Sequence, residues 1–399
     1  MNVAITSSLL GDLHCSQCGK TYDPFSRQTV SRCCQAPLLC DYVLDVGSVL
    51  PGDLASRPKS LWRYEELLPG IQPENRVSLG EGFTPILTLN RLASQNNLQH
   101  LLLKDEGLNP TGSFKARGLS MAISKAKENG EQACIIPTAG NAGVAMAAYC
   151  ARAGMEAVVV MPRHTPDAFK EACRAYNARL IEVDGLINDC AANVQEINQS
   201  GAYFDVSTLK EPYRLEGKKT MGFEIAEQLA WQLPDVIVYP TGGGTGLIGI
   251  WKAFDEMQSL GWLPQEVTLP RMVAVQAESC CPIVTTWQGK QLNSKQYVGR
   301  PTLANGLAVP RPIGEPLILS VLLESGGTAI AVSDEEMVKG VRELARYEGI
   351  FGAPEGGAVW AATKKLLEQG WIQPNERVLL LNTGSGQSYL DNLKGKLTD

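Results

Sequence analysis

The fold is decided by the stretch Lys104-Asp105-Glu106-Gly107-Leu108-Asn109-Pro110-Thr111-Gly112-Ser113-Phe114-Lys115-Ala116-Arg117-Gly118. It follows an apolar run, and its Asn-Pro and Thr-Gly pairs predict a turn before a helix that begins near Ser113. Lys115 is therefore expected in the first turn of a helix, where backbone amides attract an anion. A solvated lysine is the ordinary alternative. A nucleotide-binding loop is excluded, because Ser113 and Phe114 stand where a Lys followed by Ser or Thr is required.

The same stretch resembles the cofactor-lysine segment of pyridoxal-phosphate enzymes of the tryptophan-synthase-β type, and within them the threonine synthase group. The resemblance rests on Asn-Pro-Thr-Gly-Ser-Phe-Lys, at residues 109–115. It implies that Lys115 forms the Schiff base with pyridoxal 5'-phosphate and that Ser113 lies at the substrate. The group usually reads Ser-Phe-Lys-Asp-Arg-Gly, so Ala116 is a departure from its pattern.

Helical patterns and short apolar runs alternate after Lys115. Helices are expected at residues 118–128, 143–153 and 165–177, and strands at residues 133–136, 157–161, 235–239, 272–275 and 378–381. The alternation is typical of parallel βαβ units and predicts an α/β fold with open parallel sheets. With the resemblance, we expect a zinc-ribbon-like segment at 1–48, a large cofactor-binding domain at 49–118 and 222–399, and a small domain at 119–221.

Two loops at strand ends are candidate ligand sites. The first, residues 137–143, follows a strand and starts a helix, so its amides form an anion site, although Thr138 alone also reads as a helix cap. It resembles the Ser-Thr-Gly-Asn loop of the family. The resemblance implies that the backbone of Thr138, Ala139 and Gly140 holds the substrate carboxylate, and that Asn141 donates to the phenolate oxygen of the cofactor.

The second loop, residues 240–249, is rich in glycine, which lets the backbone close round a phosphate at a helix N-terminus. It contains Gly-x-Gly-x-x-Gly, and the next strand ends at Glu278, so a nicotinamide-dependent oxidoreductase is an alternative. That alternative leaves Lys115 and the first loop unexplained. The resemblance assigns the cofactor phosphate to Gly242, Gly243, Gly244, Thr245 and Gly246.

Further matches concern the substrate. Residues 212–220 resemble the family segment Arg-x-Glu-Gly-Gln-Lys-Thr, which implies that Arg214 holds a substrate phosphate, with Lys104 as the second cation. Taken alone, either side chain would read as a surface charge. Ala142 departs from the family, because a hydroxyl residue often follows the loop asparagine there.

The C-terminal part supplies two more matches. Residues 381–386 resemble the family's Leu-Thr-Gly-x-Gly, which implies that the hydroxyl of Thr383 faces the pyridine nitrogen of the cofactor. Without the resemblance, Thr383 is explained equally well as a residue whose hydroxyl caps a turn. Glu355 matches the family's Pro-Glu-Gly, and we expect it near the reacting groups without assigning it a role.

The N-terminal cysteines predict a metal site. Cys15-x-x-Cys18 is a knuckle typical of one side of a tetrahedral zinc, and two of the three thiols of Cys33, Cys34 and Cys40 would complete it. Our predicted set is Cys15, Cys18, Cys34 and Cys40. Because Cys33, Cys34 and Cys40 do not repeat the Cys-x-x-Cys spacing, the alternative is a ribbon that no longer binds metal.

Composition limits the remaining classes. The length of 399 residues predicts two or more domains, and 44% hydrophobic with 20% charged residues is an ordinary composition for a globular protein. A net charge of −6 without a basic cluster argues against nucleic acid as a partner. No leader and no long apolar run are evident, so we expect a cytoplasmic protein without membrane contact, with its 11 cysteines reduced or bound to metal.

The resemblance implies a homodimeric enzyme with a small amino-acid substrate. Our first hypothesis is the activity of the threonine synthase group, in which O-phospho-L-homoserine and water give L-threonine and phosphate. The second keeps the cofactor in a threonine or serine ammonia-lyase, or in a β-replacement synthase acting on a phosphorylated amino acid. A non-enzymatic zinc-ribbon protein is the third, and Lys115 argues against it. Fold and cofactor alone do not choose among reactions.

Overall fold

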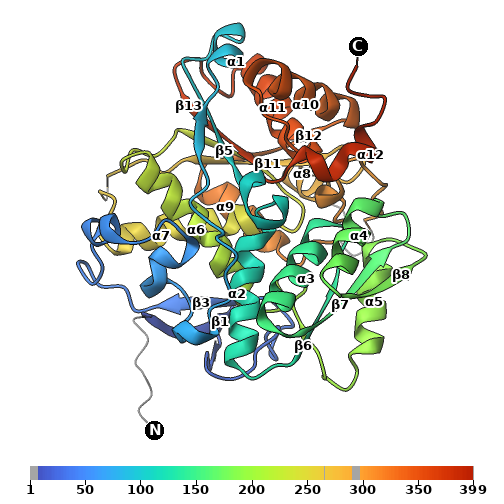
Figure 1. Ribbon diagram of the computed structural model, residues 1–399. Helices are drawn as coiled ribbons and strands as arrows, with labels where there is room; N and C mark the ends of the chain where they lie inside the picture. The colour runs from blue at the N-terminus through green and yellow to red at the C-terminus, as the bar shows by residue number, and fades with distance from the viewer. Residues whose placement is uncertain (1–7, 265, 290–296, 399) are drawn as a thin grey trace. The chain divides into compact units, whose positions relative to one another are not determined.

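The computed structural model describes residues 8–264, 266–289 and 297–398 (Figure 1). The chain divides into two compact units. Unit 1 consists of Met1–Phe83, Lys115–Glu224 and Gly249–Gln265, and unit 2 of Thr84–Phe114, Ile225–Ile248 and Glu266–Asp399. Helices α6 (Tyr213–Gln228) and α7 (Thr245–Ser259) have residues in both units.

Unit 1 contains a four-stranded parallel sheet with the strand order β8-β7-β6-β9. Its strands and helices are β6 (Ala133–Pro137), β7 (Glu156–Pro162), β8 (Arg179–Val183), β9 (Phe204–Asp205), α2 (Lys115–Glu128), α3 (Asn141–Ala153), α4 (Asp167–Ala175) and α5 (Ile187–Ile197). The central strands are apolar along their length because helices cover a parallel sheet on both faces. Ile135, Val158 and Val160 are fully buried with Cys190 of α5.

A smaller antiparallel sheet of unit 1 forms the N-terminal ribbon, with the order β2-β1-β3. Its strands are β1 (Leu10–Cys15), β2 (Thr21–Tyr22) and β3 (Leu38–Tyr42), and the 3-10 helices η1 (Pro51–Ser56), η2 (Leu61–Leu67) and η3 (Pro73–Asn75) follow. The hydroxyl of Tyr42 donates to Glu216 of α6 at 2.8 Å, and Lys252 of α7 donates to the carbonyl of Cys40 at 2.7 Å. Polar contacts therefore connect the ribbon to the rest of unit 1.

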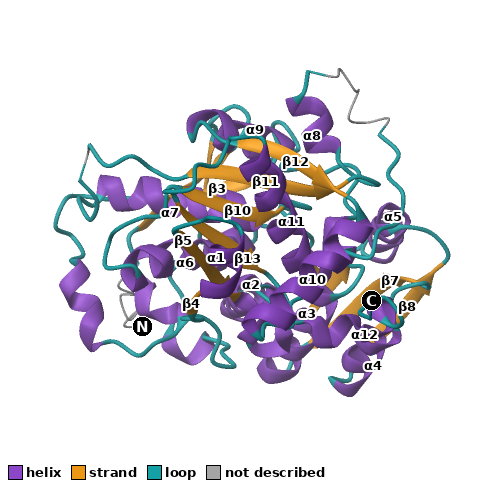
Figure 2. Ribbon diagram, turned by 90° about the horizontal axis from the view of Figure 1, so that it is seen from above, coloured by secondary structure: helices purple, strands orange, loops and turns teal. Residues whose placement is uncertain are grey.

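Unit 2 is built on a six-stranded sheet with the order β12-β11-β10-β13-β5-β4, in which only β4 is antiparallel to its neighbour. Its strands are β4 (Ile86–Thr88), β5 (His100–Asp105), β10 (Val236–Pro240), β11 (Arg271–Ala277), β12 (Thr328–Val332) and β13 (Arg377–Asn382). Figure 2 shows β10, β11 and β12 side by side, as their hydrogen-bonded registers require.

The other elements of unit 2 surround this sheet. They are α1 (Asn90–Gln95), α8 (Pro282–Trp287), α9 (Glu315–Glu324), α10 (Asp334–Glu348), α11 (Pro354–Glu368) and α12 (Leu390–Leu393), with the 3-10 helices η4 (Glu106–Leu108), η5 (Pro110–Gly112), η7 (Asn305–Leu307) and η8 (Gly386–Tyr389). One core joins the strands to α11, and Trp360 of α11 is fully buried in the same cluster as Val238 and Leu380.

The strand order places a topological switch point in unit 2. From β10 the chain continues outward to β11 and β12, and β13 then returns to the place between β10 and β5. Because β10 and β13 are parallel neighbours, the loops that follow them leave the same edge of the sheet. Ligands of open parallel sheets bind at the carboxyl ends of the strands where the order reverses.

The prediction of an α/β fold with two parallel sheets and a small cysteine-bearing N-terminal sheet is confirmed. The five predicted strands lie on β6, β7, β10, β11 and β13, with ends shifted by a residue or two. Helix α2 begins at Lys115, the predicted cofactor lysine.

Candidate active site

The glycine-rich loop lies in unit 2, at the end of β10 and the start of α7, where amides and the helix dipole favour an anion. Gly244 has φ +77°, a conformation that side chains rarely adopt, and a Cβ there would collide with Ile318. Thr245 begins α7 and is buried. The local fold thus presents residues 242–246 as a closely packed backbone cradle.

A second strand end in unit 2 carries Thr383, directly after β13. The amide of Phe114 donates to the carbonyl of Thr383 at 3.1 Å, and Ser113 forms a bridge with Gly384. The turn before Lys115 is therefore fastened to the loop that follows β13. Within the described part of the chain, the hydroxyl of Ser113 is fully buried and has no hydrogen-bond partner. A buried hydroxyl without a partner is suited to accept one from a ligand.

Two residues of unit 2 support these loops. The amide of Asn382 donates to Asp105 at 2.7 Å, and burial raises the pKa of that carboxyl. Glu355 accepts from the amide of Gly306 at 2.8 Å and from the hydroxyl of Tyr389 at 3.0 Å. The sequence assigned no role to Asn382, although its position at the end of an apolar run, directly before Thr383, could have indicated one.

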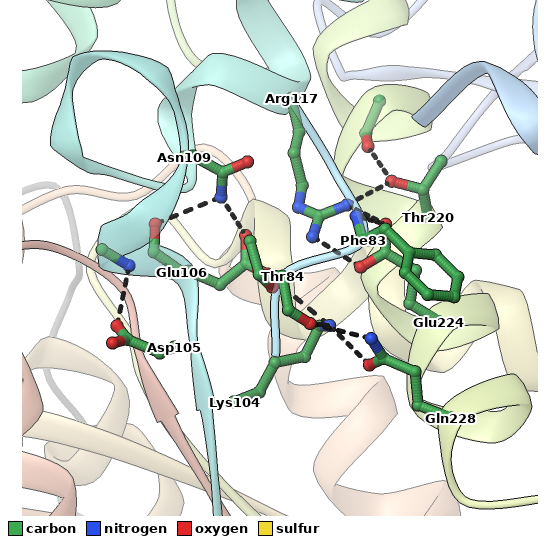
Figure 3. Close-up of polar contacts among 12 residues, drawn as sticks. Phe83, Thr84, Lys104, Asp105, Glu106, Asn109, Arg117, Thr220, Glu224 and Gln228 are labelled. Atoms are coloured by element: carbon green, nitrogen blue, oxygen red, sulfur yellow. Dashed lines mark hydrogen bonds and ion pairs between the residues drawn. The ribbon is translucent and has the colours of Figure 1, made fainter. Parts of the chain in front are cut away.

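Lys104 is fully buried in unit 2. Its ammonium donates to the carbonyl of Thr84 at 2.9 Å and to the side chain of Gln228 at 3.0 Å, and lies 4.0 Å from Glu106 (Figure 3). Glu106 in turn accepts from Asn109 at 2.8 Å. These contacts join β5 to the segments around it. The substrate-binding role expected for Lys104 stays a prediction.

Lys115 belongs to unit 1, where it is the partly exposed first residue of α2. Two residues later, Arg117 forms a fully buried pair with Glu224 of α6, at 2.5 and 2.7 Å (Figure 3). Thr220 accepts from Arg117 at 3.0 Å, and Glu224 also accepts from the amide of Phe83 at 2.7 Å. This pair fixes α2 against α6. The sequence did not predict this pair, because no residue of the motif indicates that Arg117 is buried.

The loop after β6 carries Thr138, Ala139, Gly140 and Asn141, also in unit 1. The hydroxyl of Thr138 accepts from the amides of Gly140 at 3.2 Å and Gly143 at 3.3 Å. Thr138 thus acts as a cap that shapes the loop, while Ala139 and Asn141 are partly exposed at the start of α3. The amide of Gly140 is therefore engaged by this cap, and the amide of Thr138 donates to the carbonyl of Val160 at 2.9 Å. The substrate-binding role expected for this loop stays a prediction.

Arg214 lies in the first turn of α6 in unit 1 and is 1% exposed. Its Nη1 donates to the carbonyl of Val206 at 2.6 Å. Its Nε is buried without a hydrogen-bond partner among the described residues. Glu211 accepts from the amides of Tyr213 at 2.7 Å and Arg214 at 3.1 Å, and burial raises the pKa of this carboxyl to about 7. Arg214 is thus not the surface charge that its residue type alone suggests.

Four cysteines of the ribbon form a compact group, Cys15, Cys18, Cys33 and Cys34, with all sulfurs within 4.8 Å of one another. Cys18 and Cys33 are 3.4 Å apart at sulfur. Such a set matches a tetrahedral thiolate site, since zinc binds sulfur at about 2.3 Å. The prediction that Cys40 would complete the set is wrong in its geometry, and Cys33 takes that place. Register explains this, because β3 places Leu38 opposite Cys15 and Cys40 opposite Leu13.

The predicted residues therefore fall into two groups. Unit 2 brings Ser113 close to Thr383 and holds the glycine-rich loop at the neighbouring strand end. Unit 1 holds Lys115, the loop at 138–141 and Arg214. None of the helices in the described ranges is long and apolar enough to cross a membrane.

Comparison with known proteins agrees with this geometry. The profile of the family described as "Pyridoxal-phosphate dependent enzyme" matches residues 77–384. The chain is 35% identical to the threonine synthase of Methanocaldococcus jannaschii over 377 residues, 93% of this chain and 91% of that protein. Identity to the threonine synthase of Methanosarcina acetivorans is also 35%, over 375 residues with the same coverage of both chains.

A solved structure supports the fold. The crystal structure of an O-ureido-L-serine synthase superposes with a TM-score of 0.65 at 23% identity, covering 79% of this chain and 93% of that chain. The chain therefore belongs to the pyridoxal-phosphate-dependent enzymes, and its relatives at 35% identity include threonine synthases.

Proposed function

We propose that this enzyme is a threonine synthase, converting O-phospho-L-homoserine and water to L-threonine and phosphate. The observation that carries the proposal is Arg214, a buried cation at a helix N-terminus whose Nε has no partner among the described residues. Burying a guanidinium with an unused donor is unfavourable unless an acceptor arrives. The phosphate of the substrate is such an acceptor, and the two threonine synthase relatives each match 93% of this chain.

The residues of the chain fit pyridoxal 5'-phosphate. Residues 242–246 would hold its phosphate at the start of α7, and the buried hydroxyl of Thr383 would meet the ring nitrogen. Asn141 would donate to the phenolate oxygen, and Lys115 would hold the cofactor covalently. When bound, the cofactor supplies an electron sink that stabilises negative charge on the substrate.

The protein's own contribution is then binding, orientation and proton movement. The loop at residues 138–140 would hold the substrate carboxylate. The amine of Lys115 would take the α-proton and then a β-proton, which allows the C–O bond at the γ-carbon to break, and protons would be returned to the γ-carbon and finally to the α-carbon. Arg214 holds the phosphate while it leaves from the γ-carbon. Water then adds at the β-carbon, which gives the hydroxyl of threonine and balances the reaction.

The second candidate, an ammonia-lyase or a β-replacement synthase, is favoured by two departures from the threonine synthase pattern, Ala116 and Ala142. Ala142 removes a hydroxyl from the loop that we assign to the carboxylate. A lyase acting on serine or threonine has no phosphate to hold. It therefore gives no reason for a buried Arg214.

A product assay separates the candidates. Wild-type enzyme should release phosphate from O-phospho-L-homoserine and form threonine, with little ammonia from serine or threonine. Arg214→Ala should lower kcat/KM for phosphate release about 10- to 150-fold, which is the loss expected when one charge-assisted hydrogen bond is removed. Arg174→Ala is the matched control, because Arg174 is an exposed arginine of the same unit. Ammonia as the main wild-type product, unaffected by Arg214→Ala, would replace this proposal with the lyase.

The ribbon cysteines are proposed as a structural metal site. Zinc suits four thiolates, and Cys15, Cys18, Cys33 and Cys34 supply four within one group. The group lies on the N-terminal ribbon, whereas Lys115 begins α2, so we assign the metal no part in the reaction.

A further inference from the structure

A cavity of about 640 Å³ lies along α10 in unit 2, and no motif match assigned a role to the residues around it. Its volume is within the range of small-molecule sites in proteins. Most of its wall is supplied by α10, and Leu303 and Lys396 complete it. Helix α10 lies beside α11, the helix that carries Glu355 (Figure 1).

The wall of this cavity is rich in cations. Lys339, Arg342 and Arg346 follow one another at spacings of three and four residues, so they lie on one face of α10 on successive turns. Lys396 of the C-terminal segment adds a fourth cation. Like charges on successive turns of a helix repel one another. A bound anion would relieve this repulsion.

The carboxylates of the wall are fewer, and two of the three are bonded to other groups. Glu343 accepts from the indole of Trp360 at 2.5 Å and from Lys364 at 2.6 Å. Asp334 accepts from the amide of Leu303 at 3.0 Å. Glu335, the third, is exposed. The carboxylates of the wall therefore do not neutralise its four cations.

The rest of the wall is apolar. It consists of Leu303, Val338 and Tyr347, and Val338 is 8% exposed. The ring of Tyr347 lies 5.2 Å from the guanidinium of Arg91 and 5.9 Å from that of Arg346. An apolar group of a ligand would remove this surface from water. The wall therefore fits a molecule that joins an apolar body to several negative groups.

One side of the cavity is connected to the proposed cofactor cradle of unit 2. Leu303 is three residues before Gly306, whose amide donates to Glu355 at 2.8 Å. A Cβ at Gly242 would lie 2.1 Å from the carbonyl of Gly306, so the segment at 303–309 packs directly on the glycine-rich loop. A ligand that contacts Leu303 would restrain this segment and, through it, the loop.

We propose that the cavity along α10 is a regulatory site for a small organic acid with an apolar body and two or more carboxylates. The four cations would bind the carboxylates, and the apolar wall would bind the body. Because the ligand restrains the segment at 303–309, it slows the release of pyridoxal 5'-phosphate from the glycine-rich loop. The inference holds for any reaction of the cofactor, so it does not depend on the proposed function.

The first test measures binding of benzenetricarboxylate, an aromatic ring with three carboxylates, to the cofactor-loaded enzyme by titration calorimetry. Lys339→Gln with Lys396→Gln should weaken binding about 5- to 25-fold, since one exposed charge contact contributes up to about fivefold. Lys394→Gln is the matched control, because Lys394 is an exposed lysine of the same C-terminal segment that does not line the cavity. Citrate, which lacks the ring, should bind more weakly than the probe, and uncharged benzamide should not bind.

The second test follows the cofactor. Release of pyridoxal 5'-phosphate from the loaded enzyme, measured by its absorbance, should be slower with saturating benzenetricarboxylate than without it. In the double variant, the same concentration of probe should have a smaller effect. Equal release rates of the wild type with and without bound probe would reject the regulatory role.

The binding results also decide the matter. Failure of the wild type to bind benzenetricarboxylate at millimolar concentration would overturn the proposal. Equal binding to the wild type and the double variant would overturn it as well, because the probe would then occupy another site. Benzamide binding as tight as that of benzenetricarboxylate would show that the cations have no part in recognition, and a loss in Lys394→Gln as large as in the double variant would show only a general effect of surface charge.

Discussion

Replacing Arg117 tests whether the buried pair with Glu224 holds α2 in place. Both side chains are 0% exposed, and their two contacts measure 2.5 and 2.7 Å. Arg117→Ala leaves the carboxylate of Glu224 buried without its counter-charge. Removing one partner of a buried pair costs about 3–5 kcal/mol in the free energy of unfolding, whereas deleting both partners costs far less.

The assay is urea unfolding followed by circular dichroism, at one protein concentration with saturating cofactor. Arg117→Ala should lower the midpoint strongly, and Arg117→Met with Glu224→Gln should recover much of the loss. Glutamine at position 224 keeps an acceptor for the amide of Phe83, which donates to it at 2.7 Å. The matched control is Arg163→Ala, since Arg163 pairs with Asp184 at 2.6 Å with both side chains more than half exposed.

Exposed pairs contribute little to stability, so Arg163→Ala should leave the midpoint nearly unchanged. The reasoning fails if Arg117→Ala is as mild as this control. It also fails if the double variant is no more stable than Arg117→Ala.

Three shorter predictions follow from other parts of the chain. Borohydride reduction of the loaded enzyme should attach the cofactor to Lys115, and mass spectrometry of Lys115→Ala should find no label at that peptide; a wild-type label on another lysine contradicts the assignment. Metal analysis should give about one zinc per chain, lost in Cys18→Ser/Cys33→Ser but kept in Cys281→Ser, and full retention in the double variant would exclude the ribbon site. Burial raises the pKa of Glu211 to about 7, so this carboxyl binds more protons in the folded state than in the unfolded state. Its contribution to the free energy of unfolding is therefore fully present below about pH 4.5 and is lost as the pH rises to 7. Glu211→Gln should abolish this decrease in the free energy of unfolding, which is about 3 kcal/mol at most. If the free energies of unfolding of variant and wild type change in parallel from pH 4.5 to 7, the role assigned to Glu211 is wrong.

The local sequence was sufficient to predict most of the helices and strands and the candidate loops between them. Strands such as β7 and β13 are continuous apolar runs because a parallel sheet is covered on both faces, and the turn residues before Lys115 mark the start of α2. Glycine-rich and capped loops at strand ends indicate anion sites by their backbone chemistry alone. The cofactor family followed from three such motifs, and the comparison with known proteins confirmed it.

Sequence was insufficient wherever the answer depended on which segments meet. Cysteine spacing could not choose between Cys33 and Cys40, because the choice was made by the register of β3 on β1. Lys104 and Arg214 both read as surface charges in the sequence, yet both are buried, one on β5 of unit 2 and the other at the start of α6 in unit 1.

The sequence by itself thus determined the secondary structure, the cofactor family and the lysine that we assign to it, because these depend on short-range patterns and on side-chain chemistry. Only the tertiary structure decided which cations are buried, which thiols cluster, and that Arg117 pairs with Glu224. The physical reason is that desolvation and charge pairing depend on what surrounds a group in space. Those surroundings come from residues that are about 20 to more than 100 positions away in the chain.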